Sequence, residues 1–162
     1  MKKNKLLYII LIILLSITLD QILKIVVRNT IAYYQTIEVF AKYFTLTKVE
    51  NTGAFLSLGN DLPRVFYYIL MVILPILVIG YAFYYLLSKS GHSKAIIIGI
   101  SLVIGGGLGN IIDRILYGSV TDFMHMDFVI FRTGVFNIAD MCVMAGMGFI
   151  LFDMYLKKKE SK

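Results

Sequence analysis

Four apolar stretches divide the chain, and each is long enough to cross a lipid bilayer as a helix. The pattern predicts helices at about 6–28, 65–87, 95–113 and 135–156. A bilayer core of ~30 Å requires about 20 residues of helix. Between the first two stretches, Thr36–Phe40 and Tyr43–Val49 are rich in the β-branched and aromatic residues typical of strands. The sequence therefore predicts one membrane domain: an all-α bundle of four transmembrane helices, with a small extracytoplasmic β-sheet between helices one and two.

Three of these stretches contain residues that modify a plain apolar helix. Pro75, near the middle of the second stretch, predicts a kink. Gly105–Gly109 in the third stretch allows a neighbouring helix to approach closely. The first stretch follows a basic start, as in a secretory signal peptide, but its apolar run is too long and contains Asp20 and Lys24. We therefore expect the first stretch to remain as a helix of the mature protein.

The composition agrees with a membrane protein. Hydrophobic residues make up 59% of the 162 residues, and the mean hydropathy is +0.80. Charged residues make up 16%, against roughly 25% in a typical soluble domain. The net charge of +6 comes from basic residues beside the apolar stretches, which argues against a nucleic-acid-binding patch. With Cys142 as the single cysteine, an intramolecular disulfide is excluded.

The distribution of basic residues predicts the orientation in the membrane. Nine of the 16 Lys and Arg residues lie in the N-terminus, the 88–94 loop and the C-terminus. Six lie in or beside the two longer segments, at about 29–64 and 114–134. Cytoplasmic loops carry the excess of Lys and Arg in membrane proteins. We therefore expect both termini in the cytoplasm and the two longer segments outside it.

Polar residues within the helices indicate one site in the outer half of the membrane. A polar pair at helical spacing occurs in three of the helices: Asp20 with Lys24, Asn110 with Arg114, and Asn137 with Asp140. At a rise of ~1.5 Å per residue, these pairs lie about 21–22 Å above the inner face. Alternatively, each pair extends separately to the outer interface, which suits the long side chains of Lys24 and Arg114. Aspartates are too short for that, so a shared site is the better interpretation.

Two carboxylates near this level suggest acid–base chemistry. Asp122 follows the third helix, and Asp140 lies just inside the fourth. Two carboxylates held close together share a proton, so that one activates water as a base and the other acts as an acid. This is the arrangement of an aspartyl peptidase. The sequence contains neither G-x-S-x-G nor H-E-x-x-H. His125, flanked by Asp122 and Asp127, is interpreted as a solvent-exposed loop residue rather than a metal ligand.

The chain resembles lipoprotein signal peptidases, also called signal peptidase II, over nearly its whole length. The resemblance is carried by five short motifs in order: Asp20-Gln21-x-x-Lys24, Asn51-x-Gly53-Ala54, GGGLGN ending at Asn110 with Asp113-Arg114, Val120-x-Asp122-Phe123, and Phe136-Asn137-x-Ala139-Asp140. Two positions depart from the pattern common in that family. Phe55 directly follows Ala54, and Met141 follows Asp140.

The resemblance implies a function and a set of site residues. The implied catalytic pair is Asp122 and Asp140. The implied substrate-binding or supporting residues are Asp20, Lys24, Asn51, Gly53, Asn110, Arg114 and Asn137. The implied reaction is removal of signal peptides from bacterial prolipoproteins, on the N-terminal side of a diacylglyceryl-modified cysteine, without a metal or cofactor. The implied setting is the bacterial inner membrane, with membrane lipid and globomycin-type inhibitors as further partners, a monomeric state, and an active site near the outer leaflet.

A second interpretation is a small ion- or proton-coupled transporter subunit. Charged residues within the membrane also mark ion pathways. A pathway requires polar groups at several depths, whereas here they gather on the outer side. Proton flux that depends on Asp140 would favour a transporter, and cleavage of a peptide bond would favour the peptidase.

Overall fold

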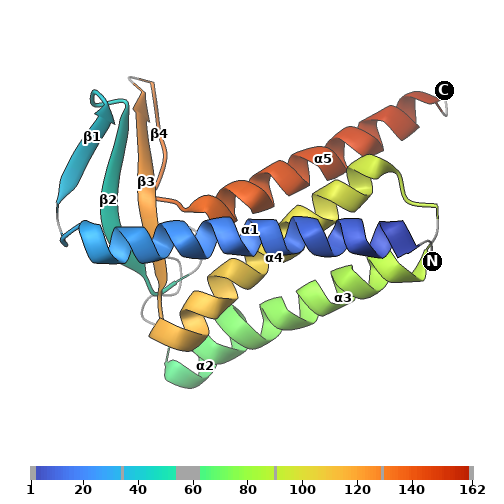
Figure 1. Cartoon of the computed structure of the whole chain (residues 1–162), viewed down its shortest axis with the longest axis horizontal. Coiled ribbons are helices and arrows are strands. Elements are labelled where there is room, and N and C mark those ends of the chain that lie inside the picture. Colours follow the sequence, from blue (N-terminus) through green and yellow to red (C-terminus); the bar gives the residue numbers. More distant parts are fainter. Residues whose placement is uncertain (1–2, 34, 54–62, 90, 129, 161–162) are drawn as a thin grey trace.

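The long helices lie side by side, with a small sheet at one end and both termini at the other (Figure 1). The computed structural model describes residues 3–33, 35–53, 63–89, 91–128 and 130–160. The elements in chain order are α1 (Lys3–Thr30), β1 (Thr36–Phe40), β2 (Phe44–Asn51), α2 (Arg64–Tyr68), η2 (Ile69–Ile73), α3 (Leu74–Ser88), α4 (Lys94–Tyr117), β3 (Val120–Phe128), β4 (Phe131–Arg132) and α5 (Ile138–Glu160). Within this part of the chain, four helical segments are long and apolar enough to cross a membrane: Asn4–Thr30, Arg64–Ser88, Lys94–Tyr117 and Ile138–Lys159.

Helix α4 extends further than its apolar pattern predicted. The predicted helix ended at 113, where charged residues begin, but α4 continues to Tyr117. Its first turn is capped by Ser93, whose hydroxyl accepts a hydrogen bond from the Ile96 N–H at 3.1 Å. Its C-terminus is closed by Gly118, which has a φ of 75° and whose N–H donates to the Arg114 carbonyl. The polar end of α4 is therefore part of the helix, with Asp113 buried and Arg114 partly buried.

The second apolar segment is not a uniform α-helix. The π-helical turn η2 lies between α2 and α3, and Pro75 falls in the first turn of α3. Proline has no N–H to donate and is best tolerated in the first turn of a helix. The predicted irregularity at Pro75 thus takes the form of a π-helical turn just before it.

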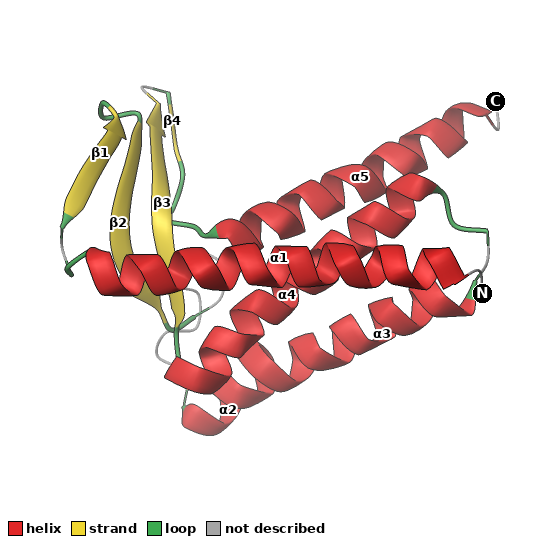
Figure 2. Cartoon of the chain, in the orientation of Figure 1, coloured by secondary structure: helices red, strands yellow, loops and turns green. Residues whose placement is uncertain are grey.

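The sheet is antiparallel with the order β1-β2-β3-β4. The prediction that it is built between the first two helices was incomplete, because β3 and β4 come from the segment after α4. That segment was interpreted as a loop because its polar residues hide the strand pattern. The strands run across the helices at the end of the molecule opposite the two termini (Figure 2). In the pairing of β2 with β3, Val49 lies opposite Asp122, and Glu50 lies opposite Thr121.

Glycines allow α4 to pack closely against both α1 and α5. A Cβ atom on Gly109 would lie 2.7 Å from the Asp20 Oδ2 atom, and one on Gly106 would collide with the Ala139 carbonyl. Helix α4 therefore approaches α1 and α5 closely at these glycines, as the glycine-rich stretch predicted. A second packed cluster lies between the C-terminal part of α1 and the sheet, where Val27 and Ile31 are buried with Phe123. The sheet is thus fixed to the helices at the level of the polar pairs.

Candidate active site

Asn137 and Asp140 form a reciprocal cap at the start of α5. The Asn137 Oδ1 atom accepts the Asp140 N–H at 2.9 Å, and the Asp140 Oδ2 atom accepts the Asn137 N–H at 3.2 Å. This is the geometry of a capping box, in which two side chains satisfy each other's free backbone donors. It explains why α5 begins at Ile138 rather than at the predicted position 135. The cap also fixes the carboxylate of Asp140 at the positive end of the helix dipole.

Asp122 lies on β3, directly beside this cap. Its side chain is 3% exposed. Its Oδ1 atom accepts a hydrogen bond from the Asn137 Nδ2 atom at 2.6 Å, and its Oδ2 atom accepts one from the Asn51 Nδ2 atom at 3.1 Å. Asn51 is itself oriented by the Gly53 N–H, which donates to its Oδ1 atom at 3.0 Å. Asn137 therefore contacts both carboxylates, which come from different elements of the fold.

The environment of Asp122 favours its protonated form. Burial raises the pKa of Asp122 to about 7, and the nearby negative charge of Asp140 acts in the same direction. The hydrogen bonds from Asn51 and Asn137 lower this pKa, but they do not outweigh burial. A carboxyl group that keeps its proton near neutral pH, beside a second carboxylate, can act as a general acid.

Asn110 links Asp140 to helix α1. Its Nδ2 atom donates to the Asp140 Oδ1 atom at 2.9 Å. Its Oδ1 atom accepts from the Lys24 Nζ atom at 2.9 Å and from the Asn137 Nδ2 atom at 3.1 Å. Because the oxygen is occupied by two donors, the amide nitrogen must face Asp140. Lys24 and Asn137 together thus determine which group of Asn110 faces the carboxylate.

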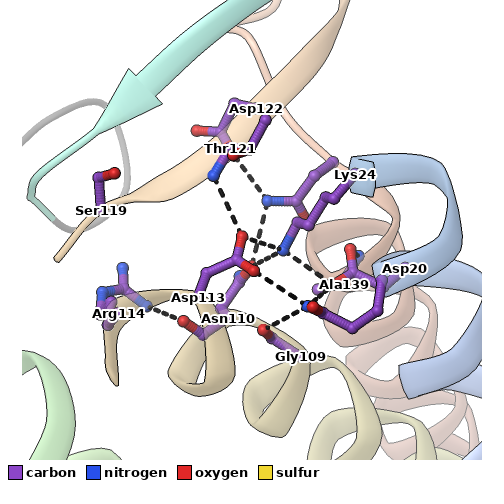
Figure 3. A network of polar contacts seen from close by, with 12 residues as sticks. Asp20, Lys24, Gly109, Asn110, Asp113, Arg114, Ser119, Thr121, Asp122 and Ala139 are labelled. Atoms are coloured by element: carbon purple, nitrogen blue, oxygen red, sulfur yellow. Dashed lines mark hydrogen bonds and ion pairs between the residues drawn. The ribbon is translucent and has the colours of Figure 1, made fainter. Parts of the chain in front are cut away.

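Lys24 lies in a buried cluster of charges (Figure 3). Its Nζ atom is 2.8 Å from the Asp20 Oδ2 atom and 3.1 Å from the Asp113 Oδ2 atom, and all three side chains are fully buried. This confirms the predicted pairing of Asp20 with Lys24. Asp20 also accepts the Ala139 N–H at 2.9 Å, one of the free donors at the start of α5. The cluster therefore fixes the position of α5 as well as neutralising charge.

Three polar residues of this cluster were not among the predicted site residues: Gln21, Arg28 and Asp113. Asp113 accepts hydrogen bonds from the Gln21 Nε2 atom at 3.1 Å and from the Thr121 N–H at 3.2 Å. Its Oδ2 atom is 2.9 Å from the Arg28 Nη2 atom. Helical spacing contained the signal, since Arg28 is four residues after Lys24 and Asp113 is three after Asn110. Arg28 and Asp113 are the last residues of the predicted helices 6–28 and 95–113, and neither belonged to the polar pairs selected from the sequence.

Arg114 points to the chain after β2 rather than to the two carboxylates. Its Nη2 atom donates to the Gly53 carbonyl at 2.9 Å, and its Nη1 atom donates to the Asn110 carbonyl at 3.5 Å. Gly53 is buried at this contact. Ala54 and Phe55 lie outside the described residues, and Met141 is exposed. The structure thus places Arg114 and Gly53 together at one side of the site.

The interpretation of His125 as a loop residue was wrong. His125 lies within β3, opposite Thr45, and its side chain is partly buried. Strand pairing with β2 accounts for this, and the polar pattern had concealed the strand. Among the residues that the structure describes, no group of three His, Cys, Asp or Glu side chains is arranged to hold a metal ion.

A family model described as Signal peptidase (SPase) II matches residues 12–156. The chain belongs to the signal peptidase II family. This is the aspartic peptidase family of lipoprotein signal peptidases. Membership of this family and the four apolar helical segments both fit a multi-pass bacterial membrane protein.

Individual signal peptidase II relatives match most of the chain. A lipoprotein signal peptidase of Clostridioides difficile (strain 630) is 40% identical over 153 residues, which cover 94% of this chain and 97% of the relative. One from Streptococcus thermophilus (strain CNRZ 1066) is 37% identical over 149 residues, covering 92% of each. A solved structure described as a bacterial membrane enzyme has a TM-score of 0.84 and 26% identity, covering 96% of this chain and 92% of the other. None of these findings supports the transporter interpretation.

Proposed function

We propose that this chain removes signal peptides from bacterial prolipoproteins with Asp122 and Asp140 as its catalytic pair, cleaving on the N-terminal side of the diacylglyceryl-modified cysteine. The observation that carries this assignment is the double contact of Asn137. It donates through Nδ2 to Asp122 and through its backbone N–H to Asp140. Two carboxylates from separate elements are thereby held at one buried place.

The geometry supports the following chemistry. The ionised carboxylate of the pair accepts a proton from water, and the oxygen of that water attacks the scissile carbonyl. The protonated carboxyl group donates to the carbonyl oxygen, which gives a tetrahedral gem-diol. The proton taken from water then passes to the nitrogen as the C–N bond breaks. The gem-diol returns its other proton to the carboxylate that donated it, and the new carboxyl group of the signal peptide forms. Asn51, Asn110 and Asn137 hold the two carboxylates in place through the hydrogen bonds described above. Each of these steps uses protein side chains and water alone.

The rate of cleavage should depend on pH in a bell-shaped manner. Below the first ionisation of the pair, both carboxyl groups are protonated and neither serves as a base. Because burial raises the pKa of Asp122 to about 7, its proton is lost as the pH rises through that value, and the acid function is lost with it. Initial rates measured from about pH 4 to pH 9 should therefore fall on the alkaline side near neutrality. A flat profile, with the enzyme folded throughout, would contradict the shared proton.

The decisive experiment is a gel-shift assay with a diacylglyceryl-modified prolipoprotein and the purified enzyme. Cleavage should shorten the lipidated substrate and leave its unlipidated precursor intact. A parallel measurement in proteoliposomes tests proton flux. An intact lipidated substrate, together with a proton flux that Asp140→Asn abolishes, would overturn the proposal in favour of a transporter.

We also infer that all four helical segments span the membrane, with both termini in the cytoplasm and the sheet outside it. Three observations support this arrangement. Nine basic residues gather at the termini and the 88–94 loop. The termini lie at the opposite end of the molecule from the sheet (Figure 1). Large apolar side chains on α3 are exposed, among them Leu77 at 64%, Tyr81 at 69% and Tyr84 at 67%, as expected where lipid surrounds a helix.

This orientation puts the active site near the outer leaflet. Asp20 on α1 lies about 21 Å above the inner face of a ~30 Å core. A prolipoprotein anchored by two acyl chains would present its modified cysteine at that level, while its lipid stays in the membrane. The chain is proposed to act there as a monomer.

Arg114 and Asn51 are proposed to contribute to a groove that binds both substrate and globomycin-type inhibitors. Arg114 holds the Gly53 carbonyl, and Asn51 holds the Gly53 N–H. Arg114→Ala and Asn51→Ala should each reduce kcat/KM and inhibitor affinity at least about tenfold, since the first removes the hydrogen bond to the Gly53 carbonyl and the second removes those to Asp122 and the Gly53 N–H. Arg132→Ala is the matched control, because Arg132 is 76% exposed and pairs with Asp127 on the sheet. A fall in cleavage with unchanged inhibitor affinity would rule out a shared groove.

A further inference from the structure

Glu50 and Thr121 lie in the sheet, each immediately before a residue of the candidate site. Glu50 precedes Asn51 on β2, and Thr121 precedes Asp122 on β3. Glu50 and Thr121 are also direct partners across the two strands. Successive side chains of a strand point to opposite faces, so this pair lies on the face away from Asn51 and Asp122. The face of the sheet opposite Asn51 and Asp122 therefore carries the polar pair Glu50 and Thr121.

Thr121 is held by three different elements. Its side chain is fully buried. The Oγ1 atom accepts a hydrogen bond from the Arg28 Nε atom of α1 at 2.8 Å and donates one to the Glu50 Oε1 atom of β2 at 2.9 Å. Its backbone N–H donates to Asp113 of α4 at 3.2 Å. Thr121 thus connects the strand of Asp122 to two helices and to the strand of Asn51.

Further contacts complete an outer polar cluster, which consists of Arg28, Glu50, Ser119 and Thr121. The Ser119 Oγ atom donates to the Glu50 Oε2 atom at 2.6 Å, so both carboxylate oxygens of Glu50 are engaged. The Arg28 guanidinium lies 3.9 Å from the centre of the Tyr117 ring, and its side chain is 17% exposed. These contacts distinguish the cluster from a pair of solvated surface charges.

Arg28 has a role that the neighbouring Lys24 does not perform. It contacts Thr121 through Nε and Asp113 through Nη2 at the same time. The planar guanidinium presents several donors in a fixed fork, whereas an ammonium group is a single point. Arg28 and Lys24 together also balance the two buried negative charges of Asp20 and Asp113. The Arg28 guanidinium therefore connects Thr121 of the sheet to Asp113 of the charge cluster.

We propose that the outer polar cluster positions Asp122 and Asn51 for the chemical step of signal-peptide cleavage. This inference rests on the proposed role of Asp122. The cluster acts through the strand backbone, so its members are positioning residues. Catalytic groups must be held close to their productive geometry, and small displacements reduce the rate steeply. With Thr121 held by α1, α4 and β2, the carboxylate of the next residue keeps one position relative to Asn137.

The test uses two substitutions of Thr121. Thr121→Val preserves the size of the side chain but removes the hydrogen bonds to Arg28 and Glu50. It should lower kcat about tenfold while KM for a lipidated prolipoprotein changes by less than about twofold. Thr121→Ser retains the hydroxyl group and should restore kcat to within about twofold of the unmodified enzyme. Thr47→Val, on β2 opposite Thr36, is the matched control and should leave both constants unchanged.

Glu50→Ala provides an independent measurement, because Glu50 is partly exposed and its replacement leaves no large cavity. It should also lower kcat with little change in KM. In the double variant with Thr121→Val, the losses should be less than multiplicative, since both changes remove the same hydrogen bond.

Three results would overturn the inference: an unchanged kcat in the folded Thr121→Val enzyme, an equal loss in Thr121→Ser, or fully multiplicative losses in the double variant. The Asp122→Asn variant separates this inference from the proposed function. Normal cleavage by Asp122→Asn would remove the function assigned to Asp122. A loss in Asp122→Asn with an unchanged Thr121→Val would remove the positioning role alone.

Discussion

Asp122→Asn and Asp140→Asn should each reduce cleavage of a lipidated prolipoprotein about a thousandfold or more. An amide neither takes the proton from water nor donates a carboxyl proton, so one half of the acid–base pair is lost. The gel-shift assay gives the rate, and thermal unfolding in detergent shows whether each variant is folded. Near-normal turnover by either folded variant would exclude that residue from the catalytic pair.

The matched control for this experiment is Asp127→Asn. Asp127 lies on the same strand as Asp122 but is partly exposed and paired with Arg132. Its replacement should leave cleavage essentially unchanged. Asp122→Asn should also lower stability slightly, because both Asp122 oxygens accept amide hydrogen bonds and the new NH₂ group must face one of those donors.

Removal of Lys24 should have the largest effect on stability. In Lys24→Met, Asp20 loses its ion pair with Lys24. Asp113 also loses its ion pair with Lys24 and retains only the one with Arg28. Asp20 and Asp113 are both fully buried. Breaking a buried ion pair by removing one partner typically costs about 3–5 kcal/mol. Cleavage should fall as well, because the Asn110 oxygen loses one of its two donors and keeps only that from Asn137. Denaturant unfolding in mixed micelles measures the change in stability.

Lys157→Met is the matched control for the charge cluster. Lys157 pairs with Asp153 near the C-terminus of α5, and its side chain is 61% exposed. Its loss should change stability much less than loss of Lys24. The complementary variant Asp20→Ala should lose both stability and activity. If Asp20→Ala stayed as stable as the unmodified enzyme and lost turnover alone, Asp20 would belong with the catalytic residues.

The apolar pattern predicted the helices and much of the site because both depend on helical spacing. Asp20, Lys24, Asn110 and Asn137 were expected at one depth, and their side chains do meet. The rise along a helix is fixed, so residue counts predict which positions of neighbouring helices lie at the same level. The strand Thr36–Phe40 was predicted from its β-branched and aromatic residues, and it is observed with the same limits.

The strand that carries Asp122 was not predictable in the same way. Residues 120–128 alternate poorly, because Asp122 and Thr121 are both buried and polar, each satisfied by partners distant in sequence. A strand of this kind is recognised by its pairing with β2, which lies some 70 residues earlier. Asp113 was missed for a related reason. A charge at the end of an apolar run suggests solvent, whereas here Lys24 and Arg28 surround it.

The cap at the start of α5 restricts which residue position 137 can hold during evolution. Asn137 uses its N–H, its carbonyl, its amide oxygen and its amide nitrogen, and the nitrogen serves both Asn110 and Asp122. Aspartate lacks the amide donors, serine is too short, and glutamine displaces the amide by one carbon. No single substitution at position 137 therefore keeps the helix start and the chemistry together. Position 137 should therefore tolerate fewer substitutions than positions whose side chains contact neither carboxylate.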